Sequence, residues 1–252
     1  MNAPLDISAR SLTATRLQMA GVCYGKGGVD ILTDVTLDLT ERRIGIVGRN
    51  GSGKSTLVRL LCGLIAPDSG EVRVGGIDCF ADRRAALRTV GILFQNPDHQ
   101  IIFPTVGEEV AFGLRQMGHA KTEARKMAHA ALEGFGRTDW YDRPVQTLSQ
   151  GQRHLVCLIS VLAMQPKVIV LDEPFSGLDI PTTRALRRVL DDIDATLVHV
   201  THDPGSLAGY DHVIWLSEGR IADQGRAEPV LAHFLDQMDR EGDRDAFADL
   251  SG

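Results

Sequence analysis

The sequence lacks the usual marks of secretion and of membrane insertion. Its longest nearly unbroken apolar run, 155–164, is too short to span a bilayer, and residues 1–16 contain no hydrophobic segment typical of a signal peptide. The four cysteines are scattered without a C-x-x-C pair, which disfavours both disulfides and a zinc site. A net charge of −6 argues against a general nucleic-acid binder. If this protein acts at a membrane, we expect a partner to hold it there.

One glycine-rich stretch organises the rest of the chain. Residues 48–56 read G-R-N-G-S-G-K-S-T, after an apolar run at 44–47 and before leucines at helical spacing. This strand–loop–helix pattern is typical of a P-loop, in which backbone N–H groups and a helix N-terminus bind phosphate. The alternative, a glycine-rich turn with a chance lysine, leaves the flanking pattern without a reason. The residues expected to bind a nucleoside triphosphate are Gly48, Asn50, Gly51, Ser52, Gly53, Lys54, Ser55 and Thr56.

Two further patterns carry chemistry. The apolar run 168–171 ends in Asp172 and Glu173, at the strand end where parallel sheets bind ligands. In P-loop enzymes such an aspartate holds Mg²⁺ together with the P-loop serine, here Ser55, and the glutamate polarises the attacking water. Earlier in the chain, L-S-Q-G-Q at 148–152 opens a helix with Ser149 as its N-cap. In isolation that second pattern indicates only a capped helix.

Together, these motifs resemble those of the nucleotide-binding subunits of ABC (ATP-binding cassette) transporters, over almost the whole chain. The segment 148–152 resembles the L-S-G-G-Q signature, with Gln150 in place of the first glycine. The resemblance implies ATP and Mg²⁺ as cofactors. It also implies a head-to-tail dimer, expected to be a homodimer, in which Ser149, Gly151 and Gln152 of a second chain close each ATP site.

The same resemblance assigns roles to residues outside the P-loop. Tyr24 matches the aromatic residue that stacks on adenine, and Gln95 the glutamine that links Mg²⁺ to the transmembrane partner. Asp179 lies in the D-loop, which crosses the dimer interface, and His202 matches the histidine that contacts the γ-phosphate. Each of these could instead be a structural residue, as we expect for His199 inside its strand. The implied catalytic residues are Lys54, Glu173 and His202, and the implied Mg²⁺ ligands are Ser55, Gln95 and Asp172.

A narrower resemblance lies at 94–113, where F-Q-N-P-D-H-Q precedes P-T-V-G-E-E-V-A-F-G. It is similar to the ATPases of energy-coupling factor (ECF) transporters, which drive vitamin or metal-ion uptake in prokaryotes. Around 41–51 the chain looks most like the biotin-uptake type, and the cobalt and nickel ATPases are the close alternative. A non-transport ABC ATPase is a third reading. It is disfavoured because the chain has one cassette and neither a coiled-coil insertion nor zinc cysteines.

The ECF resemblance also implies partners and a location. The ATPase would lie at the cytoplasmic face of the plasma membrane, bound to a transmembrane coupling subunit and a solute-binding membrane subunit, with no role for nucleic acid. An arginine of the coupling subunit would enter a groove near Gln95. The carboxylate expected to meet it is Asp98, with Glu108 or Glu109 as alternatives and ordinary helix N-terminal charges as the competing interpretation.

The expected fold is α/β, with a P-loop NTPase core built on a mixed central sheet. An antiparallel hairpin is predicted from 17–24 and 31–39, which forms an N-terminal β subdomain. A stretch with little strand signal, about 96–164, predicts a helical subdomain inserted into the core. The whole ATPase domain would span 17–225, preceded by a polar lead-in at 1–16 and followed by a C-terminal helix and acidic tail at 226–252.

Overall fold

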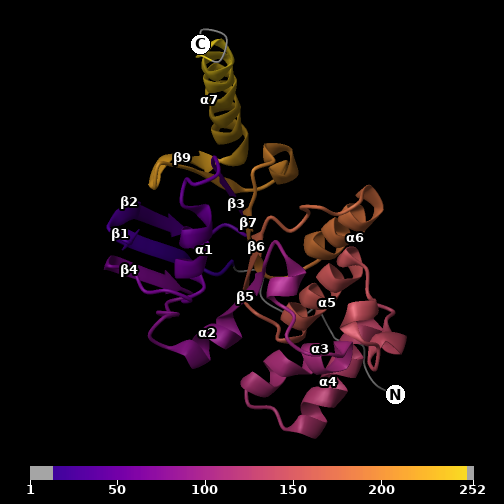
Figure 1. Cartoon of the computed structure of the whole chain (residues 1–252). Helices are drawn as coiled ribbons and strands as arrows, with labels where there is room; N and C mark the ends of the chain where they lie inside the picture. The colour runs from indigo at the N-terminus through magenta and orange to yellow at the C-terminus, as the bar shows by residue number, and fades with distance from the viewer. Residues whose placement is uncertain (1–13, 249–252) are drawn as a thin grey trace.

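The computed structural model describes the backbone of residues 14–248 and the side chains of residues 14–241. Most of the predicted lead-in and the end of the acidic tail therefore lie outside the described residues. Within them, two sheets and the helices around them form the arrangement shown in Figure 1. The predicted α/β fold with a mixed central sheet and an N-terminal antiparallel sheet is confirmed.

The central sheet has six strands. Five of them run parallel, and the last pairs antiparallel with its neighbour, which makes the sheet mixed. In spatial order the strands are β5 (Val90–Leu93), β6 (Val168–Asp172), β7 (Thr196–Val200), β3 (Arg43–Val47), β8 (His212–Ser217) and β9 (Arg220–Arg226). The parallel strands are mostly apolar because both faces of the sheet are covered.

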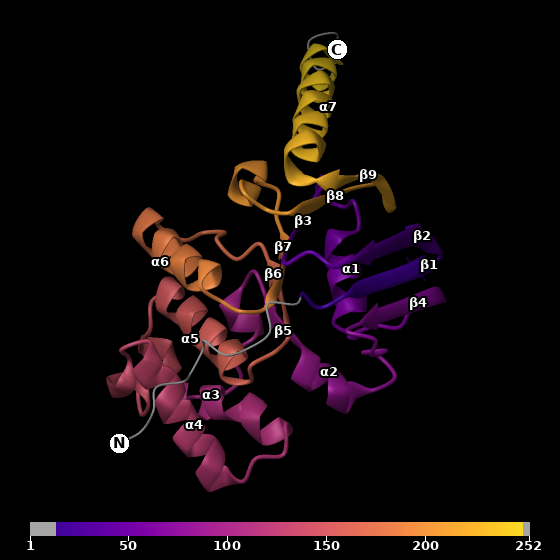
Figure 2. The same ribbon diagram turned by 180° about the vertical axis from the view of Figure 1, so that it is seen from behind.

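Alternate residues of β6 separate the two faces of this sheet. Val168 and Val170 pack in a core with α1 (Lys54–Leu61), whereas Ile169 and Leu171 pack against α5 (Gln150–Ala163) and α6 (Ile180–Asp191). Side chains of a strand point to opposite faces in turn, so one buried strand supplies both cores. In Figures 1 and 2, α1 lies on one side of β6 and β7, and α5 and α6 lie on the other.

The second sheet has three strands in the order β2-β1-β4 and is antiparallel. Its strands are β1 (Leu17–Lys26), β2 (Val29–Leu39) and β4 (Ser69–Val74). A two-residue turn of Gly27 and Gly28, with φ of 62° and 79°, joins β1 to β2. Both turn positions need positive φ, which glycine adopts without a steric penalty. The apolar side chains of this sheet share the core that contains α1.

The segment between β5 and β6 is helical, as the sequence predicts. It contains α3 (Val106–Gln116), α4 (Lys121–Gly134) and α5, with short 3₁₀ turns at Pro97–His99 (η1), Thr138–Trp140 (η2) and Val145–Thr147 (η3). Buried side chains of α3, α4 and α5 form one separate hydrophobic core. Between α4 and α5 the single turn η2 does not extend into a longer helix, because the chain soon reaches Pro144, which disfavours helix in the residue before it.

The remaining elements complete the ends of the sheets. Helix α2 (Arg83–Thr89) precedes β5, and the turn η4 (Pro204–Leu207) follows β7. The described part of the chain ends in α7 (Ala227–Ala248), which packs beside β8 and β9 and reaches the part of the molecule farthest from α4 (Figure 1).

Candidate functional site

The candidate site lies where three neighbouring parallel strands end. Strand β6 ends at Asp172, which is paired with Val200 at the end of β7, and Val200 is paired with Ile46 of β3. The carboxylate pair, the histidine segment and the P-loop follow these three strands in turn. Because carboxyl ends of parallel strands meet at one edge, the topology brings the predicted residues together.

The P-loop is closed around its own lysine. The Nζ atom of Lys54 donates to the carbonyl of Gly48 at 2.7 Å and to that of Arg49 at 2.9 Å. The side chain is buried, and burial lowers the pKa of Lys54, while the negative charges of Glu173 and Asp172 act in the opposite direction. The lysine is therefore held at the centre of the loop, close to both carboxylates.

Close approaches explain why glycines surround this lysine. A Cβ on Gly48 would lie 2.2 Å from the carbonyl oxygen of Leu216, and Gly53 adopts a φ of 103° at the start of α1. Between them, the buried hydroxyl of Ser52 has no hydrogen-bond partner. An unpaired buried hydroxyl beside a helix N-terminus fits a phosphate oxygen as its missing partner. The loop as folded therefore suits a nucleoside triphosphate.

Glu173 is fixed by contacts from the neighbouring strand. Its backbone N–H donates to Val200 O at 2.9 Å, and its Oε1 lies 2.8 Å from Nδ1 of His202. The hydroxyl of Thr201 donates to the second carboxylate oxygen at 3.4 Å. Glu173 has a φ of 50°, a left-handed conformation that is uncommon for residues other than glycine and tends to occur at functional sites. The predicted base and the predicted γ-phosphate contact are thus one hydrogen-bonded pair.

Asp172 lies in an environment that favours a bound cation. Burial raises the pKa of Asp172, and the charge of Glu173 raises it further, while Arg59 and Lys54 act in the opposite direction. Two adjacent carboxylates in a partly buried site are stabilised by a divalent cation. Within residues 14–241 no three His, Cys, Asp or Glu side chains gather as a metal site. This is compatible with Mg²⁺, which keeps several waters and takes few protein ligands.

Two further predicted residues, Gln95 and Tyr24, are held by contacts with neighbouring elements. Gln95, beyond the end of β5, donates through Nε2 to Ser176 Oγ at 3.4 Å, which puts it beside the segment that follows Glu173. Tyr24, near the end of β1, is partly buried against the core that contains α1. Its ring therefore makes structural contacts.

His199 has the structural role that its strand position suggests. Its side chain is buried, Nδ1 lies 3.0 Å from the hydroxyl of Tyr210, and burial lowers the pKa of His199 to about 3. Phe175 packs edge-on against the imidazole, with ring centroids 5.5 Å apart. The stack supports the backbone just after Glu173, a role for Tyr210 that sequence patterns did not indicate.

The signature segment forms the start of α5, and its own side chains cap this helix. Ser149 Oγ accepts the N–H of Gln152 at 3.3 Å, and Gln152 Oε1 accepts the N–H of Ser149 at 3.0 Å. This reciprocal pair is a capping box. A Cβ on Gly151 would lie 2.9 Å from Cγ2 of Thr182, so a larger residue there would require Thr182 or the start of α5 to shift.

The D-loop lies against this helix start. Asp179 caps α6 by accepting the N–H of Thr182 at 2.8 Å, and hydrogen bonds from Thr182 lower the pKa of Asp179. The amide nitrogen of Gln150 lies 3.2 Å from where a Cβ on Gly177 would be, so the unusual signature residue lies next to the D-loop. Helices α5 and α6 cover one face of the central sheet. Helix α1, which directly follows the P-loop, covers the opposite face. Within one chain the signature and the P-loop are therefore apart.

Comparisons with known proteins agree with this geometry. Residues 32–176 match the family model described as ABC transporter. The chain belongs to the ABC transporter family. It is an ATPase subunit that resembles the ECF type, as the sequence predicts.

Three relatives define the similarity further. The chain is 50% identical over 222 residues to the biotin transport ATP-binding protein BioM of Rhodobacter capsulatus, covering 88% of this chain and 95% of that protein. It is 36% identical to the energy-coupling factor transporter ATP-binding protein EcfA1 of Lacticaseibacillus paracasei, covering 88% and 82%. The structure of cbiO1 from Clostridium perfringens, part of the ABC transporter complex cbiONQ, has a TM-score of 0.73 at 31% identity and covers 86% and 90%.

One residue predicted to couple this ABC ATPase to a partner, Glu109, has its carboxylate engaged within its own chain. Glu109 is buried, and its Oε2 accepts the backbone N–H groups of Ile102 and Phe103, both at 3.0 Å. It holds the loop before α3. The sequence concealed this because a glutamate in the first turn of a helix is ordinarily exposed.

The two other candidate carboxylates remain accessible. Asp98 is exposed and pairs with Nε of Arg153 on α5 at 3.2 Å, and Glu108 accepts the hydroxyl of Thr105 at 2.7 Å. Nearby, Ile102 is an apolar side chain with 67% of its surface exposed. Sequence patterns indicated neither the Asp98–Arg153 pair nor this exposed isoleucine.

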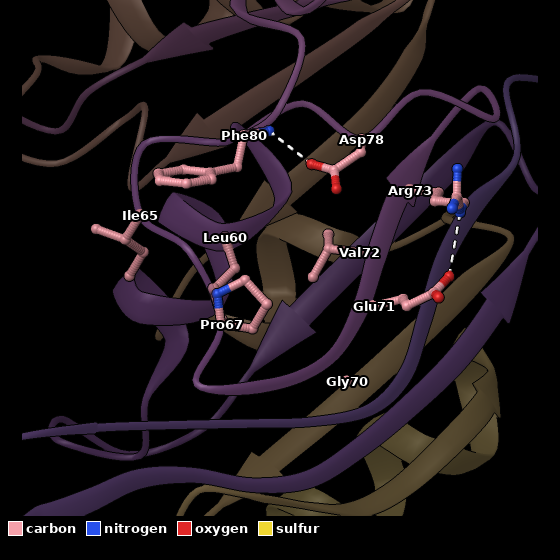
Figure 3. Close-up of a pocket in the computed structure, with 9 residues that line it drawn as sticks. All are labelled: Leu60, Ile65, Pro67, Gly70, Glu71, Val72, Arg73, Asp78 and Phe80. Atoms are coloured by element: carbon pink, nitrogen blue, oxygen red, sulfur yellow. Dashed lines mark hydrogen bonds and ion pairs between the residues drawn. The ribbon is translucent and has the colours of Figure 1, made fainter.

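A separate pocket of about 110 Å³ lies at the end of α1 remote from the P-loop (Figure 3). Leu60, Ile65 and Phe80 line it, and Glu71 with Arg73 forms an exposed ion pair at 3.3 Å on its rim. Typical sites for small molecules are about 300–1,000 Å³. The pocket is too small for ATP, so it is not an alternative to the P-loop as the nucleotide site.

Across the described residues, none of the helices has the length and apolar character that a membrane crossing needs.

Proposed function

We propose that this ABC ATPase drives biotin uptake as the energy-coupling subunit of an ECF-type importer in a prokaryote. The single observation that carries the solute is the 50% identity to a biotin transport ATP-binding protein along nearly the whole of that protein. A transporter ATPase does not itself select the solute, so the proposal concerns the complex in which this chain works. The subunit would lie at the cytoplasmic face of the plasma membrane, held by its partners.

The roles at the P-loop follow from the hydrogen bonds around it. Lys54 is already centred in the loop and would turn from two carbonyls to the outer phosphates. Glu173 would accept a proton from the attacking water, with His202 orienting its carboxylate at 2.8 Å. Tyr24 would face the base, as the family resemblance implies. Ser55, Gln95 and Asp172 would hold Mg²⁺, which when bound neutralises charge on the phosphates.

The second half of the site would come from another copy of the chain. Ser149, Gly151 and Gln152 lie with Asp179 on the face of the sheet opposite α1, so they cannot reach their own P-loop. The capping box leaves other N–H groups of the first turn of α5 without intrahelical partners, and these can bind a phosphate. A head-to-tail homodimer places this helix start over each bound ATP.

Coupling to the membrane subunits is assigned to Gln95, Asp98 and Glu108. Asp98 is exposed, yet Arg153 on the signature helix already pairs with it. An arginine from the coupling subunit would compete with Arg153 for this carboxylate. Exchange of the two arginines would change a contact of the helix that begins at the signature, which connects the membrane partner to the dimer interface.

Uptake of labelled biotin tests this function directly. The gene is expressed with its neighbouring membrane-protein genes in cells unable to take up biotin, and the Glu173→Gln variant is the matched control. ATP-dependent accumulation by the wild type alone supports the proposal. Accumulation of labelled cobalt or nickel instead would reassign the solute, and failure to copurify with any membrane subunit would contradict the transport role.

A further inference from the structure

Helix α7 is packed directly against the strand that leads into the P-loop. Val47, the last residue of β3, is fully buried in a cluster with Val230 and Phe234 of α7. Trp215 of β8, which is paired with Val47, packs edge-on against Phe234 with centroids 5.7 Å apart. The residue before Gly48 is therefore enclosed between the sheet and the C-terminal helix.

An ion pair reaches from the same helix to the P-loop itself. Nη1 of Arg49 lies 2.8 Å from Oε2 of Glu241. One turn earlier on α7, Gln237 donates to the other carboxylate oxygen, Oε1, at 2.8 Å. Both oxygens of Glu241 are thus engaged, and the carboxylate is oriented towards Arg49.

The backbone of Arg49 is part of the structure that holds the catalytic lysine. Its carbonyl accepts a hydrogen bond from Lys54 Nζ at 2.9 Å and another from the N–H of Ser52 at 3.2 Å. A continuous chain of contacts therefore runs from Glu241 through the side chain and carbonyl of Arg49 to the ammonium group of Lys54. Arg49 thereby links α7 to a carbonyl group that supports the lysine.

We propose that Glu241 is a positioning residue for the P-loop and that α7 thereby regulates ATP binding within its own chain. This proposal rests on the proposed function only in taking the P-loop as the ATP site. The ion pair anchors the loop in the form that receives phosphate, so loss of the carboxylate weakens ATP binding. By linkage, ATP binding strengthens the docking of α7 by the same factor.

The affinity test uses full-length protein at a concentration where light scattering shows monomer. Titration with a fluorescent ATP analogue measures Kd for the wild type and for Glu241→Gln, which keeps the side-chain shape but removes the charge. We expect Kd to rise about two- to fivefold, the range for an exposed ion pair, with a smaller change at high salt. Asp236→Asn is the matched control, because Asp236 pairs within α7 with Arg240 at 2.8 Å.

A double-variant comparison separates positioning from a general effect on stability. In an Arg49→Gln background, Glu241→Gln should change Kd no further, because the contact is already lost. A full additional loss in that background, or an equal loss in Asp236→Asn, overturns the proposal. Wild-type protein that binds no ATP would instead contradict the proposed function.

Hydrogen exchange supplies a readout that a merely structural ion pair does not move. In the wild type, ATP should slow amide exchange in the turns of α7 that contain Gln237 and Glu241. In Glu241→Gln, saturating ATP should leave exchange in those turns close to its unliganded rate. Equal ATP-induced protection of α7 in both proteins would overturn the regulation by α7.

Discussion

The two halves of the candidate ATP site differ in how far the isolated chain completes them. On the P-loop side, Lys54, Asp172, Glu173 and His202 converge from neighbouring strands and interact with one another. On the signature side, the polar side chains have hydrogen-bond partners close by in the sequence. Ser149 forms the capping box with Gln152, and Asp179, the N-cap of α6, accepts the N–H of Thr182. The first half has the geometry of a catalytic centre, whereas the second has the geometry of a surface that binds another molecule.

This difference shows which features a single chain can pre-organise. Groups delivered by adjacent parallel strands are positioned by the sheet register, which the core enforces. Groups that act on a second chain must remain on the surface and be stable while unoccupied. Local capping provides that stability without obscuring the rest of the helix N-terminus.

The largest effect should come from the P-loop half. Replacing Glu173 with Gln removes the carboxylate that accepts the water proton but retains the shape of the side chain. We expect kcat to fall by about 10²–10⁴, with ATP binding largely retained. Steady-state ATPase assays and nucleotide titration measure the two quantities. Turnover near the wild-type rate would show that the base lies elsewhere. The P-loop half would then not be the catalytic centre that distinguishes it from the signature half.

The next effect isolates the signature half. In a Glu173→Gln background, ATP with Mg²⁺ should convert monomer to dimer, as seen by size-exclusion chromatography with light scattering. Adding Ser149→Arg should abolish this shift, because the long cationic side chain occupies the space for the partner's phosphates. ATP binding by the monomer should remain. If dimerisation persists, Ser149 does not face a P-loop.

A third prediction concerns Glu109, whose structural role separates it from the exposed carboxylates nearby. Glu109→Ala leaves the buried N–H groups of Ile102 and Phe103 without their charged acceptor, so we expect the free energy of unfolding to fall by about 2–4 kcal/mol. Glu108→Ala is the matched control and should cost about 1 kcal/mol or less. Chemical denaturation measures both. Equal losses in the two variants would contradict the structural role of the buried Glu109 carboxylate.

The smallest effect is a pH dependence from His199. Its pKa is lowered from 6.5 to about 3 in the folded protein, so between these values the unfolded chain binds a proton that the folded chain does not. Stability from this group is therefore complete above pH 6.5 and is lost as the pH falls. From pH 7 to pH 5 the wild type should lose about 2 kcal/mol more than His199→Phe. Parallel denaturation curves at the two pH values provide the comparison, and identical losses would contradict the burial of a neutral imidazole.

Sequence patterns predicted those elements whose formation depends on local sequence. Glycine spacing before an apolar helix located the P-loop, and apolar runs located the strands that place Asp172 and His202. Three features escaped prediction because they depend on tertiary contacts. Glu109 turns inward to a loop six residues away, Asp98 meets Arg153 from a distant helix, and Glu241 meets the P-loop from the C-terminus. Local sequence carries no signal for such pairs.

A mixing experiment tests most directly the central claim that each ATP site is divided between two chains. Two full-length variants are prepared, Glu173→Gln with an intact signature and Ser149→Arg with an intact P-loop, and each is expected to be inactive alone. In a mixed dimer, the intact signature of the first chain can cover the intact P-loop of the second. The account predicts that ATPase activity appears on mixing the two chains. If Ser149→Arg alone retains the wild-type rate, or if mixing restores no activity, the ATP site is not divided between two chains in this way and the account is wrong.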